Sequence, residues 1–144
     1  MGKPEGKEST LEQKRAADAL SKVIKLEGES ELFRKRYRSY VERLGPMIIV
    51  NGLGQALATE RAAAGANPRK DEERAHKTLY DNVTSWLCRQ PDGTYPETDD
   101  LIEALMNNSQ ELYLQAQFEA LSWLEWHKKF CRAYLPRDNE HVSE

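Results

Sequence analysis

A histidine and two cysteines are the residues of this sequence best suited to hold a metal ion. His127 and Cys131 are four residues apart, so on a helix they would share one face, as metal ligands can. Cys88 could supply a third ligand. Zinc sites take three or four ligands, however, and the sequence contains no CxxC or HxxxH pair. Because free cysteine is among the most buried residue types, we favour core packing for these three residues and for His76, and we predict neither a metal nor another cofactor.

Three carboxylates stand close together at Asp99, Asp100 and Glu103. As a group they could hold a divalent cation for a nuclease reaction, or act as general acid and base. They also lie at the start of a predicted helix, where the helix dipole favours acidic side chains. We therefore predict a capping role, no catalytic residue and a protein that is not an enzyme, and we keep a metal-dependent nuclease as an alternative.

A pair of glycines follows an apolar run at Gly52-Leu53-Gly54, as in a dinucleotide-binding turn. That turn needs a third glycine or alanine three residues on, where this chain has Leu57, and it needs alternating strands. Two other interpretations stay open. Small residues can let two helices pack closely, which we favour, or exposed glycine beside Asn51 can let a backbone or a ligand approach.

Basic side chains gather in three places and offer phosphate-binding chemistry. The first group lies on the polar side of a predicted helix, the second spans a loop and the helix after it, and the third ends the last helix. From the residues alone, solvated faces with salt bridges are the simpler explanation, and cations near a helix C-terminus are favourable by themselves. The groups are Arg34, Lys35 and Arg38; Arg61, Arg69, Lys70 and Arg74; and Lys128, Lys129 and Arg132.

The total charge hides an asymmetry along the chain. The 144 residues carry 21 Lys and Arg against 24 Asp and Glu, a formal net charge of −3, which by itself argues against nucleic acid as a partner. Residues 1–44 nevertheless have a net charge of +3, residues 45–90 of +1, and residues 91–144 of −7. Charge polarised along a chain can become charge polarised over a surface, which matters for binding a polyanion.

The elements that must position these groups are helices, because the apolar residues recur every three or four positions and no convincing strand is visible. We expect Gly45-Pro46 to separate two helices, since proline fits the first turn of a helix and not its interior. The sequence predicts an all-α fold, a compact single-domain bundle of five to six helices over residues 9–135, with flexible tails at 1–8 and 136–144. The expected helix starts are Ser9, Ser30, Asp71, Thr98 or Asp99, and Asn108.

Composition also limits the cellular setting. No apolar run approaches the about 20 residues that a spanning helix needs. The first ten residues lack the apolar stretch of a signal peptide, and two cysteines suit a reducing compartment. We expect a cytoplasmic protein without membrane association.

Two segments of the chain resemble a known family. PMIIVNGLGQALA begins at Pro46, and YLQAQFEALSWLEWHKKF begins at Tyr113. At this spacing, with an Ala-rich and a Tyr-rich helix before them and a Trp-Leu helix between them, they resemble the small subunit of Cmr complexes, the type III-B CRISPR RNA-guided effector complexes of bacteria and archaea. The resemblance extends from about Arg15 to Tyr134. Its motif residues, which look mainly like packing residues, are Asn51, Gly52, Leu53, Gln55, Glu119, Trp123 and Trp126.

The resemblance implies a small, all-helical, non-catalytic protein of antiviral defence. Copies of such a subunit stack along the backbone subunits and contact the crRNA and target RNA without reading sequence. The basic groups then gain a role, since phosphate contacts need Arg and Lys on exposed helix faces. We therefore predict RNA binding by all ten basic residues named above, with other Cmr subunits and copies of the chain itself, joined head to tail through the acidic last third, as protein partners. The alternative is an assembly module with no direct RNA contact.

Overall fold

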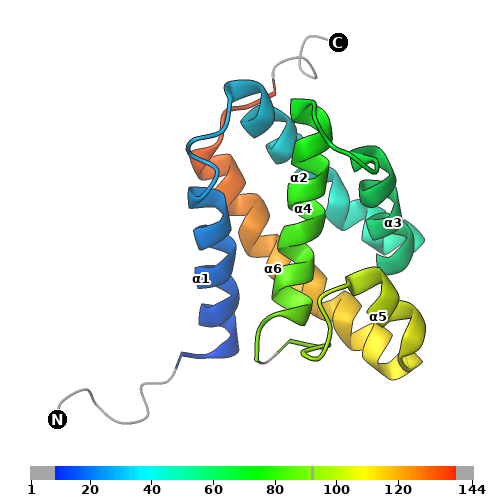
Figure 1. The fold of residues 1–144 in the computed structure, drawn as a ribbon. Coiled ribbons are helices and arrows are strands. Elements are labelled where there is room, and N and C mark those ends of the chain that lie inside the picture. Colours follow the sequence, from blue (N-terminus) through cyan, green and yellow to red (C-terminus); the bar gives the residue numbers. More distant parts are fainter. Residues whose placement is uncertain (1–8, 92, 139–144) are drawn as a thin grey trace, which may run out of the picture.

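The computed structural model of the protein describes residues 9–91 and 93–138. Within these residues it has six α-helices and no strand, which confirms the all-α prediction (Figure 1). Among the described residues, every helix is too short or too polar to span a bilayer. The helices are α1 (Leu11–Ile24), α2 (Glu31–Asn51), α3 (Leu53–Ala64), α4 (Asp71–Cys88), α5 (Leu101–Asn107) and α6 (Gln110–Tyr134).

Side-chain caps fix where four of the helices begin. In each, a Ser, Thr or Asp side chain accepts a hydrogen bond from the backbone N–H three residues on, which satisfies a donor that helix geometry leaves free. The cap of α2 is the predicted one, whereas those of α1, α5 and α6 lie one or two residues later than expected, because each of these starts has neighbouring residues that can cap. The observed caps are Thr10, Ser30, Asp100 and Ser109, with N···O distances of 3.0, 3.0, 3.3 and 3.2 Å.

The predicted break at Gly45-Pro46 is wrong, because α2 continues through both residues to Asn51. Proline removes one backbone donor and disfavours the helical conformation of the residue before it, but a glycine there has no Cβ to meet the proline ring. Leu44 and Ile48, one turn apart on either side of Pro46, have no exposed surface. Burial of the apolar helix face that they share stabilises the helix across the proline. The chain turns instead at Gly52, whose φ of 90° favours glycine.

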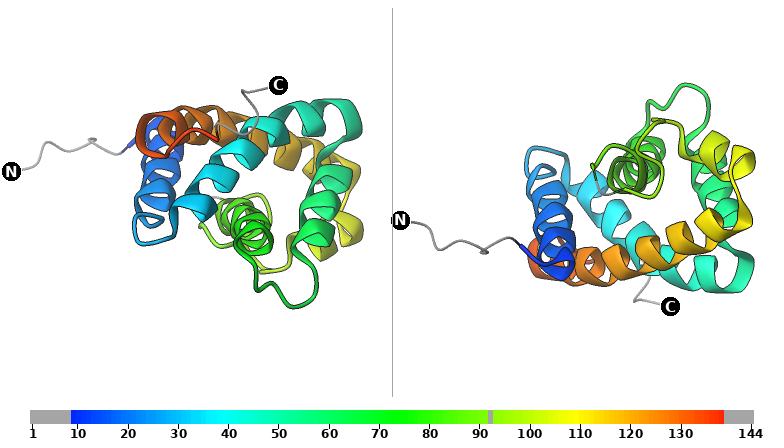
Figure 2. Two further views of the ribbon diagram at one scale, coloured as in Figure 1. Left: turned by 90° about the horizontal axis from the view of Figure 1, so that it is seen from above. Right: turned by 90° about the horizontal axis from the view of Figure 1, so that it is seen from below.

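Helices α2, α4 and α6 make most of the contacts between helices. Helix α6 contacts α1 and α2 extensively and α4 more lightly, while α4 packs against α2 and α3. Figure 2 shows α6 crossing one side of the molecule, with α1 beside one end of it and α5 beside the other. Trp123 of α6, Phe33 and Tyr37 of α2 and Leu79 of α4 have no exposed surface and form the centre of the core. This arrangement leaves the ends of α2, α4 and α6 free to carry charged side chains.

The expected tails are described only in part. Residues 1–8 and 139–144 lie outside the described residues, as does Asp92 in the turn expected before α5. Leu135, directly after α6, has an extended backbone conformation. Asp138 is buried and accepts a hydrogen bond at 2.7 Å from Arg36 Nη1. This contact ties the chain after Pro136 to the side of α2.

Candidate nucleic-acid interface

His127 is a hydrogen-bonded residue of the core. A carbonyl can only accept, so His127 Nδ1 donates to the Ala19 oxygen at 3.0 Å, and in the neutral ring Nε2 accepts from the Tyr37 hydroxyl at 2.6 Å. The Tyr37 oxygen in turn accepts from Asn82 Nδ2 at 2.8 Å. Burial lowers the pKa of His127 to about 3. Both ring nitrogens therefore have protein partners, which confirms the packing interpretation of this histidine.

The other residues considered for chemistry are also used structurally. Cys88 and Cys131 are buried, and burial raises the pKa of both thiols, that of Cys88 to about 11. Asp100 accepts from the Glu103 N–H and caps α5, as the carboxylates there were expected to do. Over residues 9–91 and 93–138, no three His, Cys, Asp or Glu side chains are grouped so that they could hold a metal ion.

The turn between α2 and α3 is a point of close packing against α6. The Leu53 amide donates to Gln117 Oε1 at 2.9 Å, and the Gly54 amide donates to the Tyr113 hydroxyl at 2.8 Å. A Cβ placed on Gly52 or Gly54 would lie 3.2 or 3.3 Å from the same hydroxyl oxygen. Side chains of α6 thus occupy the first amides of α3, which decides between the two open interpretations in favour of close helix packing.

The motif residue Glu119 joins three helices. Its carboxylate accepts from Arg15 of α1 at 2.7 and 2.8 Å and from Trp86 Nε1 of α4 at 2.9 Å. Burial alone would raise the pKa of Glu119, but these hydrogen bonds outweigh it and the pKa is lowered. Glu119 is therefore a structural anion that holds α1 and α4 against α6.

The two motif tryptophans of α6 extend this pattern. Trp123 Nε1 donates to Asp18 at 2.9 Å, and Trp126 Nε1 donates to Glu12 at 3.1 Å, so both indoles bond to carboxylates of α1. With Trp86, all three tryptophans of the chain share this pairing of indole and carboxylate. The motif residues with exposed side chains are Asn51 and Gln55.

Half of the ten predicted RNA-binding cations are paired with carboxylates. Arg132 donates to both oxygens of Glu42 at 2.6 and 2.7 Å, and Arg74 donates to both oxygens of Glu29 at 2.8 and 3.0 Å. The lysine pairs are longer, from 3.4 to 3.8 Å. A phosphate would have to compete with these carboxylates. The five paired cations are Lys35, Arg74, Lys128, Lys129 and Arg132.

The other five cations have no carboxylate within ion-pair distance among the described residues. Arg34, Arg38 and Arg61 donate to the backbone carbonyls of Glu29, Leu135 and Gly65 at 3.1, 3.0 and 3.1 Å. Arg69 and Lys70 are exposed in the loop before α4. The Glu73 carboxylate accepts from the backbone N–H groups of Arg69 and Lys70 at 3.0 and 3.1 Å and leaves their side chains without an ion pair. The side chains of these five cations therefore remain available to an anion from outside.

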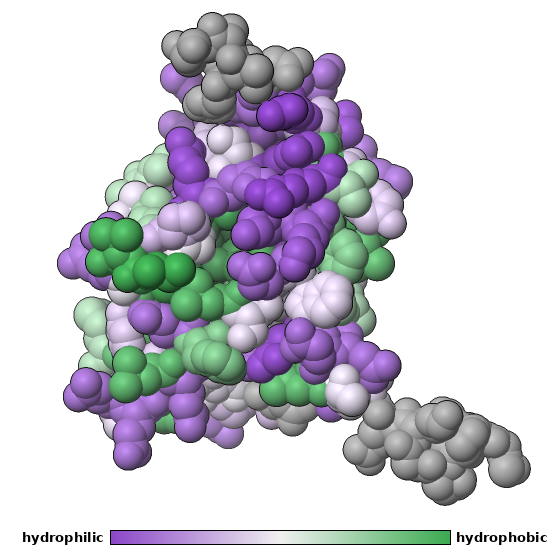
Figure 3. All heavy atoms as spheres, turned by 180° about the vertical axis from the view of Figure 1, so that it is seen from behind, coloured by the Kyte–Doolittle hydropathy of each residue, from purple (hydrophilic) through white to green (hydrophobic). Residues whose placement is uncertain are grey.

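A surface hollow of about 540 Å³ brings together arginines from α2, α6 and the chain after α6. We call it the arginine hollow. Figure 3 shows polar side chains gathered over this side of the molecule, next to the last described residues. Its lining residues are Arg38, Ser39, Glu42, Arg43, Arg132, Arg137 and Asp138.

Sequence reasoning missed two of the four arginines that line this hollow, Arg43 and Arg137. Arg43 lies two turns after Arg36 on the same face of α2, and this spacing could have revealed it. Arg137 follows Pro136 in the expected tail, where no periodicity exists to read. Its position depends on the contact between Arg36 and Asp138, which lie 102 residues apart.

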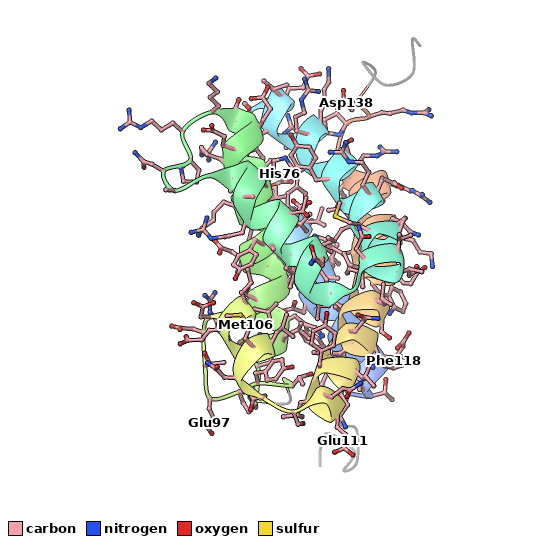
Figure 4. The ribbon with its side chains drawn as sticks, turned by 90° about the vertical axis from the view of Figure 1, so that its right-hand side faces the viewer. His76, Glu97, Met106, Glu111, Phe118 and Asp138 are labelled. Carbon is pink, nitrogen blue, oxygen red and sulfur yellow. The ribbon has the colours of Figure 1, made fainter. Side chains whose placement is uncertain are left out.

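The charge polarity of the sequence survives as polarity in space. At one end, here called the basic end, Ser30 donates to Asp71 at 2.7 Å and Arg36 donates to Asp138, so the starts of α2 and α4 and the end of the described chain meet there. Figure 4 shows Asp138 at this end and Glu97 and Glu111 at the opposite, acidic end. The carboxylates around α5 that have no ion pair among the described residues are Glu97, Asp99, Asp100, Glu103 and Glu111.

Fold and surface together define a small all-α bundle protein with a charge-polarised surface. A family model described as CRISPR-associated protein (Cas_Cmr5) matches residues 11–134. The chain belongs to this Cmr5 family, the small subunit of Cmr, type III-B, CRISPR effector complexes.

A solved structure agrees with this membership. The crystal structure of a CRISPR-associated Cmr5 family protein from Thermus thermophilus is 29% identical in sequence and superposes with a TM-score of 0.68. The match covers 89% of this chain and 100% of that protein. The resemblance seen in the NGL segment and in the tryptophan-rich last helix is therefore confirmed.

Proposed function

We propose that the protein is a non-catalytic subunit that stacks along the backbone subunits of its complex and contacts the crRNA and target RNA backbone through the basic end. One observation carries this proposal: the predicted cations without an ion pair among the described residues lie towards the end where α2 and α4 begin, and the group of carboxylates around α5 lies at the opposite end (Figure 4). Contact through this end is independent of sequence, because it uses phosphates and no base edges.

The unpaired cations should dominate the contact for a physical reason. A phosphate that binds Arg69 or Lys70 releases counterions without first breaking an ion pair. A phosphate that binds Lys128 or Lys129 must displace Glu125, which lies 3.4 and 3.8 Å from the two ammonium groups. Unpaired cations are therefore expected to contribute more to affinity than paired ones of equal charge.

The test compares two double variants that each remove two positive charges. In Arg69→Ala/Lys70→Ala the unpaired cations are lost, and in Lys128→Ala/Lys129→Ala the paired ones are lost. If both loop cations contact phosphates of a single strand, the slope of log K against log salt falls by about 1.4, and affinity at 0.1 M salt falls by about 25-fold. The measurement is fluorescence anisotropy of labelled oligouridine at several salt concentrations.

The control variant is expected to lose much less affinity. Equal losses in the two variants would mean that net charge alone sets binding, and would contradict a contact localised on unpaired cations. Repeating the comparison in a complex reconstituted with a guide RNA tests whether the same residues retain the target.

The unpaired carboxylates favour a second candidate function, an assembly module. Here the acidic end of one copy meets the basic end of the next, and other subunits make the RNA contacts. Native mass spectrometry of reconstituted complexes then reports fewer copies for Arg69→Ala/Lys70→Ala, while the isolated protein shows no RNA binding. Weaker RNA binding with unchanged copy number supports the first candidate and contradicts the second.

A further inference from the structure

The arginine hollow differs from the rest of the basic end in being concave and in mixing both signs of charge. Four arginines and two carboxylates line it, so its formal net charge is +2. Its arginines come from α2, from the last turn of α6 and from the chain after α6. A single anionic group entering the hollow would therefore meet guanidinium groups from three directions.

The four guanidinium groups are engaged to different degrees. Arg132 is held by Glu42 through two hydrogen bonds, and Arg38 donates one hydrogen bond to the Leu135 carbonyl. Arg43 lies over the Tyr40 ring, 5.1 Å from its centroid, and is exposed. Arg137 is exposed as well. Two arginines thus face solvent without a carboxylate, and a third is bound to one.

We propose that the arginine hollow binds one phosphate group of the RNA backbone, and that Glu42 is a built-in competitor of that phosphate for Arg132. This inference rests on the proposed function. The guanidinium fork binds a carboxylate and a phosphate in the same two-bond geometry, so the two anions exclude each other at Arg132. Arg43 and Arg137 receive the phosphate first, and Arg132 then exchanges Glu42 for it.

The Glu42 carboxylate has the properties that this exchange requires. It is partly exposed, with 31% of its side chain accessible, so water can solvate it when Arg132 turns away. The hydrogen bond from Arg132 lowers the pKa of Glu42, so the carboxylate is charged at neutral pH and holds the arginine until a stronger anion arrives. The consequence is weak RNA binding by a single subunit, with affinity gained when several subunits act on one strand.

The test removes the competitor without removing any arginine. Glu42→Gln keeps the shape of the side chain and frees one guanidinium charge. If Arg132 then contacts a phosphate of the single strand, affinity for oligouridine rises about fivefold at 0.1 M salt, the salt slope steepens by about 0.7, and the gain fades near 1 M salt. Glu111→Gln is the matched control, because it removes an equal charge from an exposed carboxylate of α6 that has no ion pair among the described residues and lies outside the hollow.

The outcomes of these measurements distinguish the phosphate site in the hollow from the proposed RNA contact. A gain confined to Glu42→Gln, together with a loss in Arg43→Ala/Arg137→Ala, supports the hollow as the phosphate site. If the wild-type protein binds oligouridine and Glu42→Gln behaves like Glu111→Gln, the competitor role of Glu42 is overturned while the proposed function stands. If the wild-type protein does not bind RNA and Glu42→Gln does not restore binding, the hollow and the proposed RNA contact both fail.

Discussion

Mild acid should destabilise this bundle through one buried imidazole, that of His127. Burial depresses the pKa of His127 to about 3 in the folded protein, whereas an unfolded histidine has a pKa of about 6.5. Below about pH 6.5 the unfolded chain therefore binds a proton at His127 that the folded chain does not bind. The contribution of neutral His127 to the free energy of unfolding is lost progressively as the pH falls below this value. The loss is complete only below the folded pKa of about 3.

The size of this effect follows from the two pKa values. At pH 5 the unfolded imidazole is almost fully protonated and the folded one is not, which costs about 2 kcal/mol relative to pH 7.5. The window from pH 7.5 to pH 5 excludes the stabilising carboxylates, because the pKa values of Glu42, Glu73 and Glu119 are lowered and their contributions are lost only at more acid pH. The assay is urea unfolding followed by tryptophan fluorescence at several pH values.

Removal of the imidazole should remove the pH dependence. His127→Gln cannot bind a proton, so its free energy of unfolding, though lower by about 1–3 kcal/mol from the disturbed hydrogen bonds, should lack this 2 kcal/mol loss. His76→Gln is the control, because it removes a histidine outside this network, and it should keep the loss. If His127→Gln shows the same loss as the wild-type protein, the acid sensitivity does not come from His127 and the reasoning is refuted.

Two further predictions concern stability and are measured by thermal unfolding. Gly52→Ala should cost about 1–2 kcal/mol, because φ is 90° there and the new Cβ would lie 3.2 Å from the Tyr113 hydroxyl. Gly28→Ala, which has open space around it, should change stability by less than about 1 kcal/mol, and equal losses would contradict the role of backbone conformation. Glu119→Gln should cost about 2–3 kcal/mol, since it weakens charged hydrogen bonds that join three helices. Glu125→Gln, in an exposed pair, should cost less than about 0.5 kcal/mol, and a similar loss in both would show that burial does not matter.

The helices whose position depends on nearby residues could be predicted from the sequence. Apolar periodicity and the cap at Ser30 located α2 at its start, because both depend on residues within one or two turns. The same reasoning failed at Pro46, because the cost of a proline is local whereas the burial of Leu44 and Ile48 that outweighs it depends on packing of α2 against other helices. The presence of the helices was therefore predictable. Their boundaries were not predictable at positions where tertiary packing outweighs the local helix propensity.

The candidate site was less predictable, because its properties depend on which charges meet. The sequence shows that Arg132 and Arg69 are both cations, but not that Glu42, 90 residues away, neutralises only the first. The family resemblance identified Glu119 and Trp123 as motif residues without indicating that both serve to bind α1. The charge of each chain segment predicted that the surface would be polarised. Which cations keep a carboxylate partner depends on long-range ion pairs, and the sequence does not show those.

The turn at Gly52 also sets an order for folding. The first amides of α3 bond to side chains that lie 59 and 64 residues later in the chain, on α6. Closing a loop of that length costs entropy before the contact repays it, so the first two amides of α3 have no protein acceptor until α6 is in place. In a chain leaving the ribosome, α1 to α4 emerge before these partners do. The amides at the turn between α2 and α3 then remain bonded to water until α6 docks. Docking of α6 therefore completes the bundle.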